Sequence, residues 1–217
     1  MGLSLSSNGI KVLKQFEGCR LKAYKVVPTE TYYTIGYGHY GADVMKGMII
    51  TQTQAEAYLK ADLKTFEDAV NKNVKVNITQ NQFDALVSFT YNCGPSALKS
   101  SILLKKINSG NLIDASLEFA KWNKSGGKVL TGLVKRRETE TVLFLAGYCE
   151  KPKGQVSNKT ATKPEIRWIQ WKIGESTDGI WGEKTANGIR TKRKSLGWEE
   201  TSGFTCSNNL IKELAKL

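Results

Sequence analysis

The stretch FEGCRLKAY at residues 16–24, followed by TIGYGH at residues 34–39, decides the fold of the first part of the chain. Apolar side chains at helical spacing precede it, and Gly18 ends that helix, which places Glu17 at the helix carboxyl end. Residues 24–40 are rich in Tyr, Thr, Val and Gly, a composition that predicts a short hairpin sheet. A carboxylate is therefore expected at the junction of a helix and a small sheet.

Two capping boxes begin the long helices that follow. Thr51 with Gln54, and Thr79 with Gln82, have the spacing at which the two side chains satisfy backbone N–H groups of the first turn. Further helices are expected at residues 100–107, 112–122 and 139–148. A small N-terminal β-hairpin sheet followed by many helices predicts an α+β, mainly helical domain.

The composition is that of a folded, soluble protein. Of the 217 residues 40% are apolar, and five Trp, eight Tyr and seven Phe argue against disorder. The apolar runs fall far below the roughly 20 residues that a membrane span needs, and residues 1–14 lack the apolar core of a signal peptide. We therefore expect no membrane span, no signal peptide, and a chain that stays in the cytoplasm of the cell that makes it until something releases it.

Metal and cofactor chemistry is not indicated. The chain has one His and four scattered cysteines, Cys19, Cys93, Cys149 and Cys206, without a C-x-x-C pair. In a cytoplasmic chain such cysteines are expected to be free and mostly buried thiols. We expect no metal and no cofactor.

The net charge of +12 predicts an anionic partner and divides equally between residues 1–150 and 151–217. Residues 150–163 contain no aromatic residue and no periodic apolar pattern, which is typical of an exposed linker. We therefore predict one domain at residues 1–149 and a second at residues 164–217.

The second predicted domain shows helical spacing at residues 164–173, 183–194 and 207–217, which indicates a small three-helix bundle. The last of these segments carries an apolar stripe that ends at Leu217. Because a domain of this size is near the lower limit for independent stability, several of its four tryptophans are expected to form its core rather than a ligand platform. The four are Trp168, Trp171, Trp181 and Trp198.

Two further motifs complete the pattern of the first domain. QNQFDALVSFTYNCG lies at residues 80–94, and GLVKRRETETVLF lies at residues 132–144. Together with the two opening motifs, and in the same order, they resemble the phage-type lysozymes, the muramidase endolysins that cleave the glycan of bacterial peptidoglycan. The resemblance covers about residues 7–147. It implies a lysozyme-like fold for this domain.

The resemblance also implies an activity and a set of site residues. The activity is hydrolysis of the β-1,4 bond between N-acetylmuramic acid and N-acetylglucosamine, which lyses the host cell. Such hydrolysis needs a carboxylic acid that protonates the leaving oxygen, for which Glu17 is the candidate, and Thr34 would position the water. Substrate-binding roles are implied for four further residues, Tyr37, His39, Asn92 and Arg136.

The sequence departs from the family pattern at one position. The expected Asp, the second carboxylate, is replaced by Val26, and the loop before Thr34 is two residues longer than the pattern. Two alternatives within a hydrolase are open: Glu30 takes the place of this Asp, or Thr34 alone positions the water. Alternatively, without a second carboxylate, the enzyme would be a lytic transglycosylase, in which the sugar's own 6-hydroxyl attacks and gives a 1,6-anhydro product. A catalytically decayed wall-binding protein also stays open.

Two further groups of side chains, one around His39 and one around Arg136, allow more than one interpretation. His39 is expected to order the cleft through hydrogen bonds, although a Cys–His nucleophilic site with Cys19 or Cys93 is a rival. Arg136 with Glu140 has the spacing of a surface ion pair. The family resemblance instead implies that an arginine here binds peptide carboxylates or supports Glu17.

Residues 166–189 resemble the three-helix peptidoglycan-binding module of cell-wall hydrolases. The hallmark residues are Asp178, Gly179, Trp181, Gly182 and Thr185. Asp-Gly makes a turn and Gly182 allows close backbone approach, so these residues are expected to shape the module rather than to contact a ligand. The expected partners are peptidoglycan and anionic wall polymers, reached after release from the host cytoplasm. We expect a monomer that binds no nucleic acid.

Overall fold

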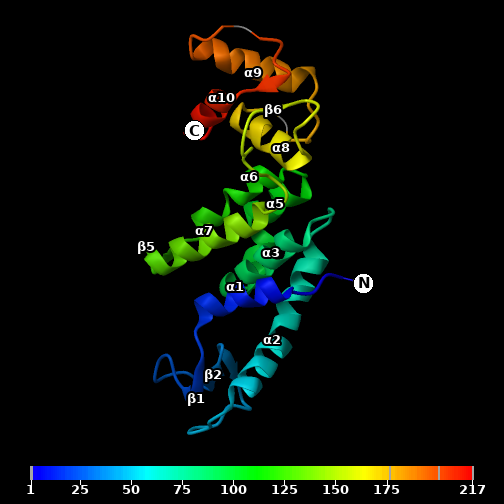
Figure 1. The fold of residues 1–217 in the computed structure, drawn as a ribbon. Coiled ribbons are helices and arrows are strands. Elements are labelled where there is room, and N and C mark those ends of the chain that lie inside the picture. Colours follow the sequence, from blue (N-terminus) through cyan, green and yellow to red (C-terminus); the bar gives the residue numbers. More distant parts are fainter. Residues whose placement is uncertain (1, 176, 200, 217) are drawn as a thin grey trace. The chain divides into compact units, whose positions relative to one another are not determined.

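The computed structural model describes residues 2–175, 177–199 and 201–216, and the chain divides into two compact units (Figure 1). Unit 1 comprises Met1–Gly110 and Ala115–Phe144, and unit 2 comprises Asn111–Asp114 and Leu145–Leu217. No helix in the described part of the chain is long and apolar enough to cross a membrane.

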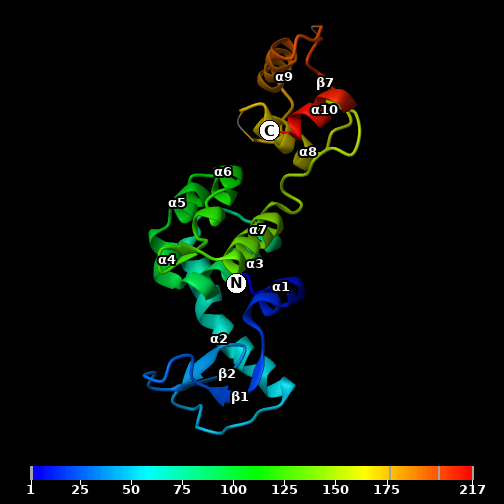
Figure 2. The same ribbon diagram turned by 90° about the vertical axis from the view of Figure 1, so that its left-hand side faces the viewer.

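Unit 1 combines a three-stranded antiparallel sheet, a two-stranded sheet and a set of helices. The elements from the start of the chain to α7 are α1 (Ser7–Glu17), β1 (Arg20–Tyr24), β2 (Tyr33–Gly36), β3 (His39–Gly41), α2 (Gln52–Asn73), α3 (Gln80–Cys93), α4 (Pro95–Ser100), α5 (Ile102–Asn108), α6 (Leu112–Ser116), η1 (Phe119–Lys121), β4 (Lys124–Ser125), β5 (Lys128–Val129) and α7 (Thr131–Leu145). The order β1-β2-β3 makes a small sheet that lies beside the first half of α2 (Figures 1 and 2).

The predicted signals for helix ends are confirmed. The Ser6 hydroxyl accepts a hydrogen bond from the Gly9 N–H at the start of α1. The helix stops at Gly18, whose φ of 63° lies in the region that favours glycine. Both predicted capping boxes are present at the starts of α2 and α3. Glu17 is consequently the last residue of α1, where the chain turns into the sheet.

Other boundaries differ from the prediction. The sheet begins at Arg20 instead of residue 24, and α7 begins at Thr131 instead of residue 139. The early turns of α7 carry glycine, lysine and arginine, so apolar spacing does not reveal them. The unpredicted β4 and β5 form a hairpin around Gly126 and Gly127, both of which have positive φ.

Helix α3 is the centre of unit 1. Every residue from Gln82 to Thr90 is buried, and α3 packs against α1, α2 and α4. The ring of Phe89 meets that of Phe119 edge-to-face, with 5.6 Å between their centroids. Near its amino end, Asp84 accepts a hydrogen bond from the Ser6 N–H at 3.0 Å, which ties the start of α1 to this helix. The core thereby fixes the position of α1 and of Glu17 at its end.

Unit 2 contains α8 (Lys163–Lys172), α9 (Glu183–Ser195), α10 (Asn208–Leu214), β6 (Val156–Ser157) and β7 (Thr205–Cys206). The sequence bounds of these three helices are close to those of the three segments predicted to be helical. The two short strands pair with each other, so that Val156 faces Cys206. Most of residues 150–163 are exposed, as expected of a linker, but Val156 forms part of β6 and is buried in the core of unit 2.

The tryptophans of unit 2 contribute to its core. Trp168 and Trp181 are buried, and Trp171 and Trp198 pack against the same cluster as partly buried side chains. The Trp181 indole N–H donates to the Gly203 carbonyl at 3.2 Å. Leu217, the last residue of the predicted apolar stripe, lies outside the described residues.

Gln170 connects the hallmark residues of unit 2. Its amide nitrogen donates to Asp178 at 2.7 Å and to the Thr185 hydroxyl at 3.0 Å, and its amide oxygen accepts the Gly179 N–H at 2.9 Å. The Ile180 N–H also donates to Asp178, and this hydrogen bond is the first cause that lowers the pKa of that carboxyl group. The Asp-Gly turn is therefore held by a buried amide inside the unit.

We predict that Gln170→Ala destabilises unit 2 by about 2–3 kcal/mol, because buried polar partners lose their hydrogen bonds. Thermal unfolding of the full chain, followed by hydrogen exchange of the amides in unit 2, measures this loss. Gln155→Ala, at an exposed position, is the matched control and should change stability by less than about 0.5 kcal/mol. Equal stability of the two variants would show that the Gln170 network is not needed.

Candidate active site

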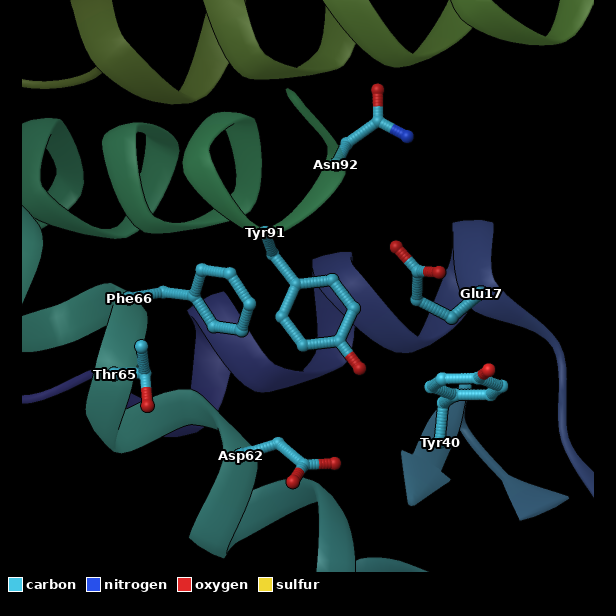
Figure 3. A pocket seen from close by; sticks show the side chains of 8 residues that line it. Glu17, Tyr40, Asp62, Thr65, Phe66, Tyr91 and Asn92 are labelled. Carbon is cyan, nitrogen blue, oxygen red and sulfur yellow. The ribbon is translucent and has the colours of Figure 1, made fainter. Parts of the chain in front are cut away.

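Unit 1 contains an open cleft of about 470 Å³ between the end of α1, the sheet, α2 and the end of α3 (Figure 3). Figure 3 shows the carboxylates of Glu17 and Asp62 and the hydroxyl of Tyr91 pointing into it. The residues that line it are Glu17, Gly38, Tyr40, Asp62, Thr65, Phe66, Tyr91 and Asn92. Two of the residues predicted from sequence, Glu17 and Asn92, are among them.

Glu17 is held by Arg136. The Arg136 Nη1 donates to Glu17 Oε1 at 2.6 Å, and the side chains are 4% and 19% exposed. Arg136 is therefore not part of a surface ion pair, since it is buried and reaches the cleft carboxylate from α7. This geometry matches the second implication of the family resemblance, an arginine that supports Glu17.

A buried network fixes Arg136 in turn. Its Nε donates to Glu140 at 3.2 Å, and its Nη2 donates to the Ser88 carbonyl at 3.0 Å. The Ser88 hydroxyl donates to Glu140 at 2.7 Å. Burial raises the pKa of Glu140, and the charges of Arg137 and Arg136 oppose that shift. The network joins α7 to α3 beneath the cleft.

Arg137, the neighbouring arginine, holds a second residue of the cleft. Its Nη2 donates to the Asn92 side-chain oxygen at 2.7 Å, and its Nε lies 3.2 Å from Glu140 Oε2. Asn92 lies on α3 two residues after Thr90, the last residue of its buried part. The predicted Arg136 and Asn92 therefore belong to one connected set of side chains, although only Asn92 lines the cleft.

His39 is held on both sides by carboxylates. Its Nδ1 lies 2.9 Å from Asp62 and its Nε2 lies 2.9 Å from Asp43, while its ring stacks on Tyr58 at 4.2 Å. Burial lowers the pKa of His39, but hydrogen bonds to Asp43 and Asp62 outweigh it and raise that pKa above its usual value. The expectation that His39 orders the cleft agrees with this geometry, since it positions Asp62.

Tyr37 and Tyr91 join the sheet to the helices. The Tyr91 hydroxyl donates to the Tyr37 carbonyl at 2.9 Å, and the Tyr37 hydroxyl accepts from Gln52 at 2.7 Å. Burial, followed by the charge of Glu17, raises the pKa of Tyr91, so this phenol stays protonated as a donor. Tyr37 itself is buried and lies outside the lining of the cleft.

Thr34 lies on the middle strand, β2, directly opposite Tyr40 of β3. Directly opposed residues of an antiparallel pair project from the same face of the sheet. Because Tyr40 lines the cleft, Thr34 points to the cleft side of the sheet, where it is buried. It does not itself line the cleft.

Glu30 lies in the loop between β1 and β2. Its Oε2 accepts the Val26 N–H at 2.8 Å, and its carbonyl accepts the Lys25 ammonium at 2.6 Å. The Glu30 carboxylate thus lies beside the position at which the family pattern has its Asp. It does not line the cleft.

The Cys–His alternative finds no support in the geometry. Both ring nitrogens of His39 face carboxylates. The Cys93 thiol contacts Arg137, and burial raises its pKa, which disfavours the thiolate. Cys19 contacts Gln52. All four cysteines are free; Cys149 and Cys206 are buried.

Within residues 2–175, 177–199 and 201–216, no group of three or more His, Cys, Asp or Glu side chains could hold a metal ion.

Sequence reasoning missed Asp62, Thr65, Phe66, Tyr40 and Tyr91, which also line the cleft. Asp62, Thr65 and Phe66 follow one another at i, i+3 and i+4 on α2, so they share a face of that helix. An acidic residue beside an apolar helix stripe was the available signal for Asp62. Only the register of the folded sheet brings Tyr40 to the cleft.

This combination of a small sheet, a helix-end glutamate and a buried arginine partner defines a lysozyme-type glycosidase. The phage lysozyme family matches residues 14–140, and the chain belongs to that family. The endolysin of Bacillus phage B103 is 50% identical over 194 residues, which cover 89% of this chain and 71% of that protein. The endolysin of Bacillus phage PZA is 52% identical over 166 residues, 76% of this chain and 64% of that protein.

Solved structures are similar over the lysozyme part. The muramidase domain of SpmX from Asticaccaulis excentricus is 38% identical with a TM-score of 0.61, covering 65% of this chain and 97% of that domain. The endolysin from Escherichia coli O157:H7 phage FAHEc1 is 42% identical, also with a TM-score of 0.61, covering 67% of this chain and 95% of that one. These relatives support a phage enzyme that lyses bacterial cell walls.

We predict that His39 stabilises unit 1 mainly at acidic and neutral pH. Its raised pKa means that this stabilisation is fully present below the unfolded value of about 6.5 and is lost as pH rises through the folded value. At lower pH it fades again as Asp43, whose pKa is lowered first by its hydrogen bond to His39, becomes protonated. His39→Asn should cost on the order of 1–2 kcal/mol near pH 5.5.

Urea unfolding of wild type and His39→Asn between pH 4 and pH 9 measures this difference. The two curves should converge at alkaline pH. A loss of stability that is the same at every pH would contradict a charged hydrogen-bonded pair.

Proposed function

We propose that this protein hydrolyses the β-1,4 bond between N-acetylmuramic acid and N-acetylglucosamine in bacterial peptidoglycan. The observation that carries the proposal is Glu17, a carboxylate at the end of α1 that faces an open cleft and is oriented by the buried Arg136. The named relatives, endolysins and a muramidase domain, supply the substrate class. The enzyme would act on the wall after release from the host cytoplasm.

In the proposed reaction Glu17 gives its proton to the glycosidic oxygen, which stays bonded to C4 of N-acetylglucosamine when it leaves C1 of muramic acid. The bond between C1 of muramic acid and that oxygen breaks as water attacks C1, and the water proton passes to a base. Arg136 fixes Glu17 Oε1 and thereby orients the carboxyl group. Asn92, which lines the cleft, and Tyr37 and His39, which support Tyr91 and Asp62, would keep the sugar-binding surface in place.

Thr34 and Glu30 are the residues proposed to position and activate the attacking water. Thr34 projects from the cleft face of β2. Glu30 is the proposed second carboxylate, supported by its 2.8 Å hydrogen bond to the backbone of Val26, the position of the missing Asp. A loop that is longer by two residues would carry the carboxylate to the same place from a different part of the chain.

A lytic transglycosylase is the second candidate, and Val26 favours it. This residue is 68% exposed and apolar where the family pattern has its second carboxylate. In that reaction the muramic acid 6-hydroxyl attacks C1, its proton passes to a base, and the product is a 1,6-anhydro sugar. Glu17 would then be the only carboxylate required.

Unit 2 is proposed as a small three-helix peptidoglycan-binding domain. Its hallmark residues resemble those of such modules, and the segment 151–217 carries half of the net charge of +12. Positive charge would favour anionic wall polymers. Because Gln170 binds Asp178, Thr185 and Gly179 inside the unit, other residues would contact the wall.

We predict that Glu17→Gln lowers the rate of peptidoglycan cleavage about a thousandfold, because the general acid is lost. Mass spectrometry of the fragments released by wild type identifies the reaction at the same time. Reducing muramic acid ends indicate hydrolysis, and fragments lighter by one water indicate a transglycosylase. Glu138→Gln, an exposed position on α7, is the control and should cleave at the wild-type rate.

The same variant separates an enzyme from a wall-binding protein. Glu17→Gln should still sediment with purified cell walls, since the proposed binding unit is intact. If wild type releases no fragments and both proteins sediment equally, the chain is a binding protein and the proposed activity is wrong.

We predict that Glu30→Gln lowers the cleavage rate roughly 10- to 100-fold if Glu30 is the second carboxylate. The glutamine keeps an oxygen that can accept the Val26 N–H, so the loop conformation should be retained. Initial rates on purified peptidoglycan test this. A wild-type rate in Glu30→Gln would leave Thr34 alone to position the water, or would favour the transglycosylase if anhydro products are found.

A further inference from the structure

Two partly exposed tyrosine rings contact each other beside the cleft, one from the loop before β2 and one from β3. Tyr32 is 41% exposed and Tyr40 is 47% exposed, although large aromatic side chains are usually mostly buried. Their ring centroids are 5.6 Å apart with an interplanar angle of 65°, an edge-to-face contact. We refer to these two side chains as the tyrosine pair.

The pair is held in one orientation. The Tyr32 N–H donates to the Tyr40 hydroxyl at 3.2 Å, which ties the loop before β2 to β3. Tyr40 is directly opposite Thr34 in the sheet, so its ring projects from the cleft face. Figure 3 shows this ring on the side of the cleft where Glu17 lies.

The loop that carries Tyr32 is also braced internally. Glu30 binds the Val26 N–H at 2.8 Å through its carboxylate and the Lys25 ammonium at 2.6 Å through its carbonyl. Lys25 Nζ in turn lies 5.1 Å from the centroid of the Tyr33 ring. Tyr32 is therefore presented by a loop with several internal contacts, and little ordering entropy would be lost on binding.

We propose that the tyrosine pair is a sugar-stacking platform that extends the glycan-binding cleft beyond the reacting bond. This inference rests on the proposed function. Tyr40 lines the cleft, and Tyr32, which is not among the lining residues, contacts the Tyr40 ring edge-to-face. The pair would therefore favour long glycan strands over short ones, and its contribution would appear in binding rather than in the bond-breaking step.

The chemistry of a pyranose ring suits this surface. One face of an N-acetylated sugar presents C–H groups, which pack on the face of an aromatic ring, while its hydroxyl groups stay in water or reach polar neighbours. A tyrosine ring provides an apolar face together with a polar hydroxyl edge. An exposed aromatic pair bordering a polar cleft therefore matches a polysaccharide better than it matches a purely apolar partner.

The test measures binding apart from cleavage. Peptide-free glycan strands of defined length are titrated into Glu17→Gln, and into Glu17→Gln combined with Tyr32→Ala, Tyr32→Phe or Ile49→Ala. Ile49 is 72% exposed and its segment pairs with β1, yet it does not line the cleft, so it controls for removing an exposed apolar side chain. Cleavage kinetics of the same Tyr32 variants in the active chain provide kcat and KM.

Tyr32→Ala should raise the Kd for long strands about fivefold, with a smaller change for short oligosaccharides. Tyr32→Phe, which keeps the ring, and Ile49→Ala should bind like the parent. In the active chain Tyr32→Ala should raise KM and leave kcat within about twofold of wild type.

Unchanged affinity for long strands in Tyr32→Ala would overturn the platform while the enzyme still cleaves. Equal losses in Tyr32→Ala and Tyr32→Phe would also overturn it, because the ring would not be the contact. A wild-type chain that cleaves no glycan would instead overturn the proposed function, and the platform with it.

Discussion

The ion-pair network from Glu17 through Arg136 to Glu140 is the constraint on which the site depends. It places the Glu17 carboxylate, at the end of α1, against Arg136 of α7. Arg136 in turn donates a hydrogen bond to the Ser88 carbonyl of α3. Removing one partner of a buried ion pair typically costs about 3–5 kcal/mol, because the remaining charge stays unpaired. The orientation of the Glu17 carboxylate and the stability of unit 1 thus depend on the same few side chains, which limits how far either can change alone.

Local signals in the sequence were sufficient to predict those helix ends that are set by residues within a single turn. Ser6, Gly18 and the two capping boxes act through neighbouring backbone groups, so they could be read without the fold. The start of α7 could not be read in this way, because the residues buried there, Arg136 and Arg137, are charged and their burial depends on contacts with α3. The same reason explains residues 150–163, where the pairing of β6 with β7 connects segments nearly fifty residues apart.

The candidate site shows a similar division. Glu17 can be predicted from a local motif. Its hydrogen bond with Arg136 joins residues 119 positions apart, and only the family resemblance suggested such a contact. Glu30 was anticipated near Val26 from the loop length, and its hydrogen bond to that backbone supports the expectation without assigning it a role. Asp62 and Tyr91 reach the cleft through helix packing, and neither has a local signal strong enough to distinguish it from an ordinary helix residue.

Unit 2 is not formed by the C-terminal part of the chain alone. It also contains Asn111–Asp114, and Ile113 of this segment belongs to its core. Transfer of residues 145–217 alone to another chain would move α8 to α10 without this short segment. The transferred unit would then meet a different side chain at the place of Ile113 in its core. A cut of the chain before Leu145 therefore does not separate unit 2 from the rest of the protein.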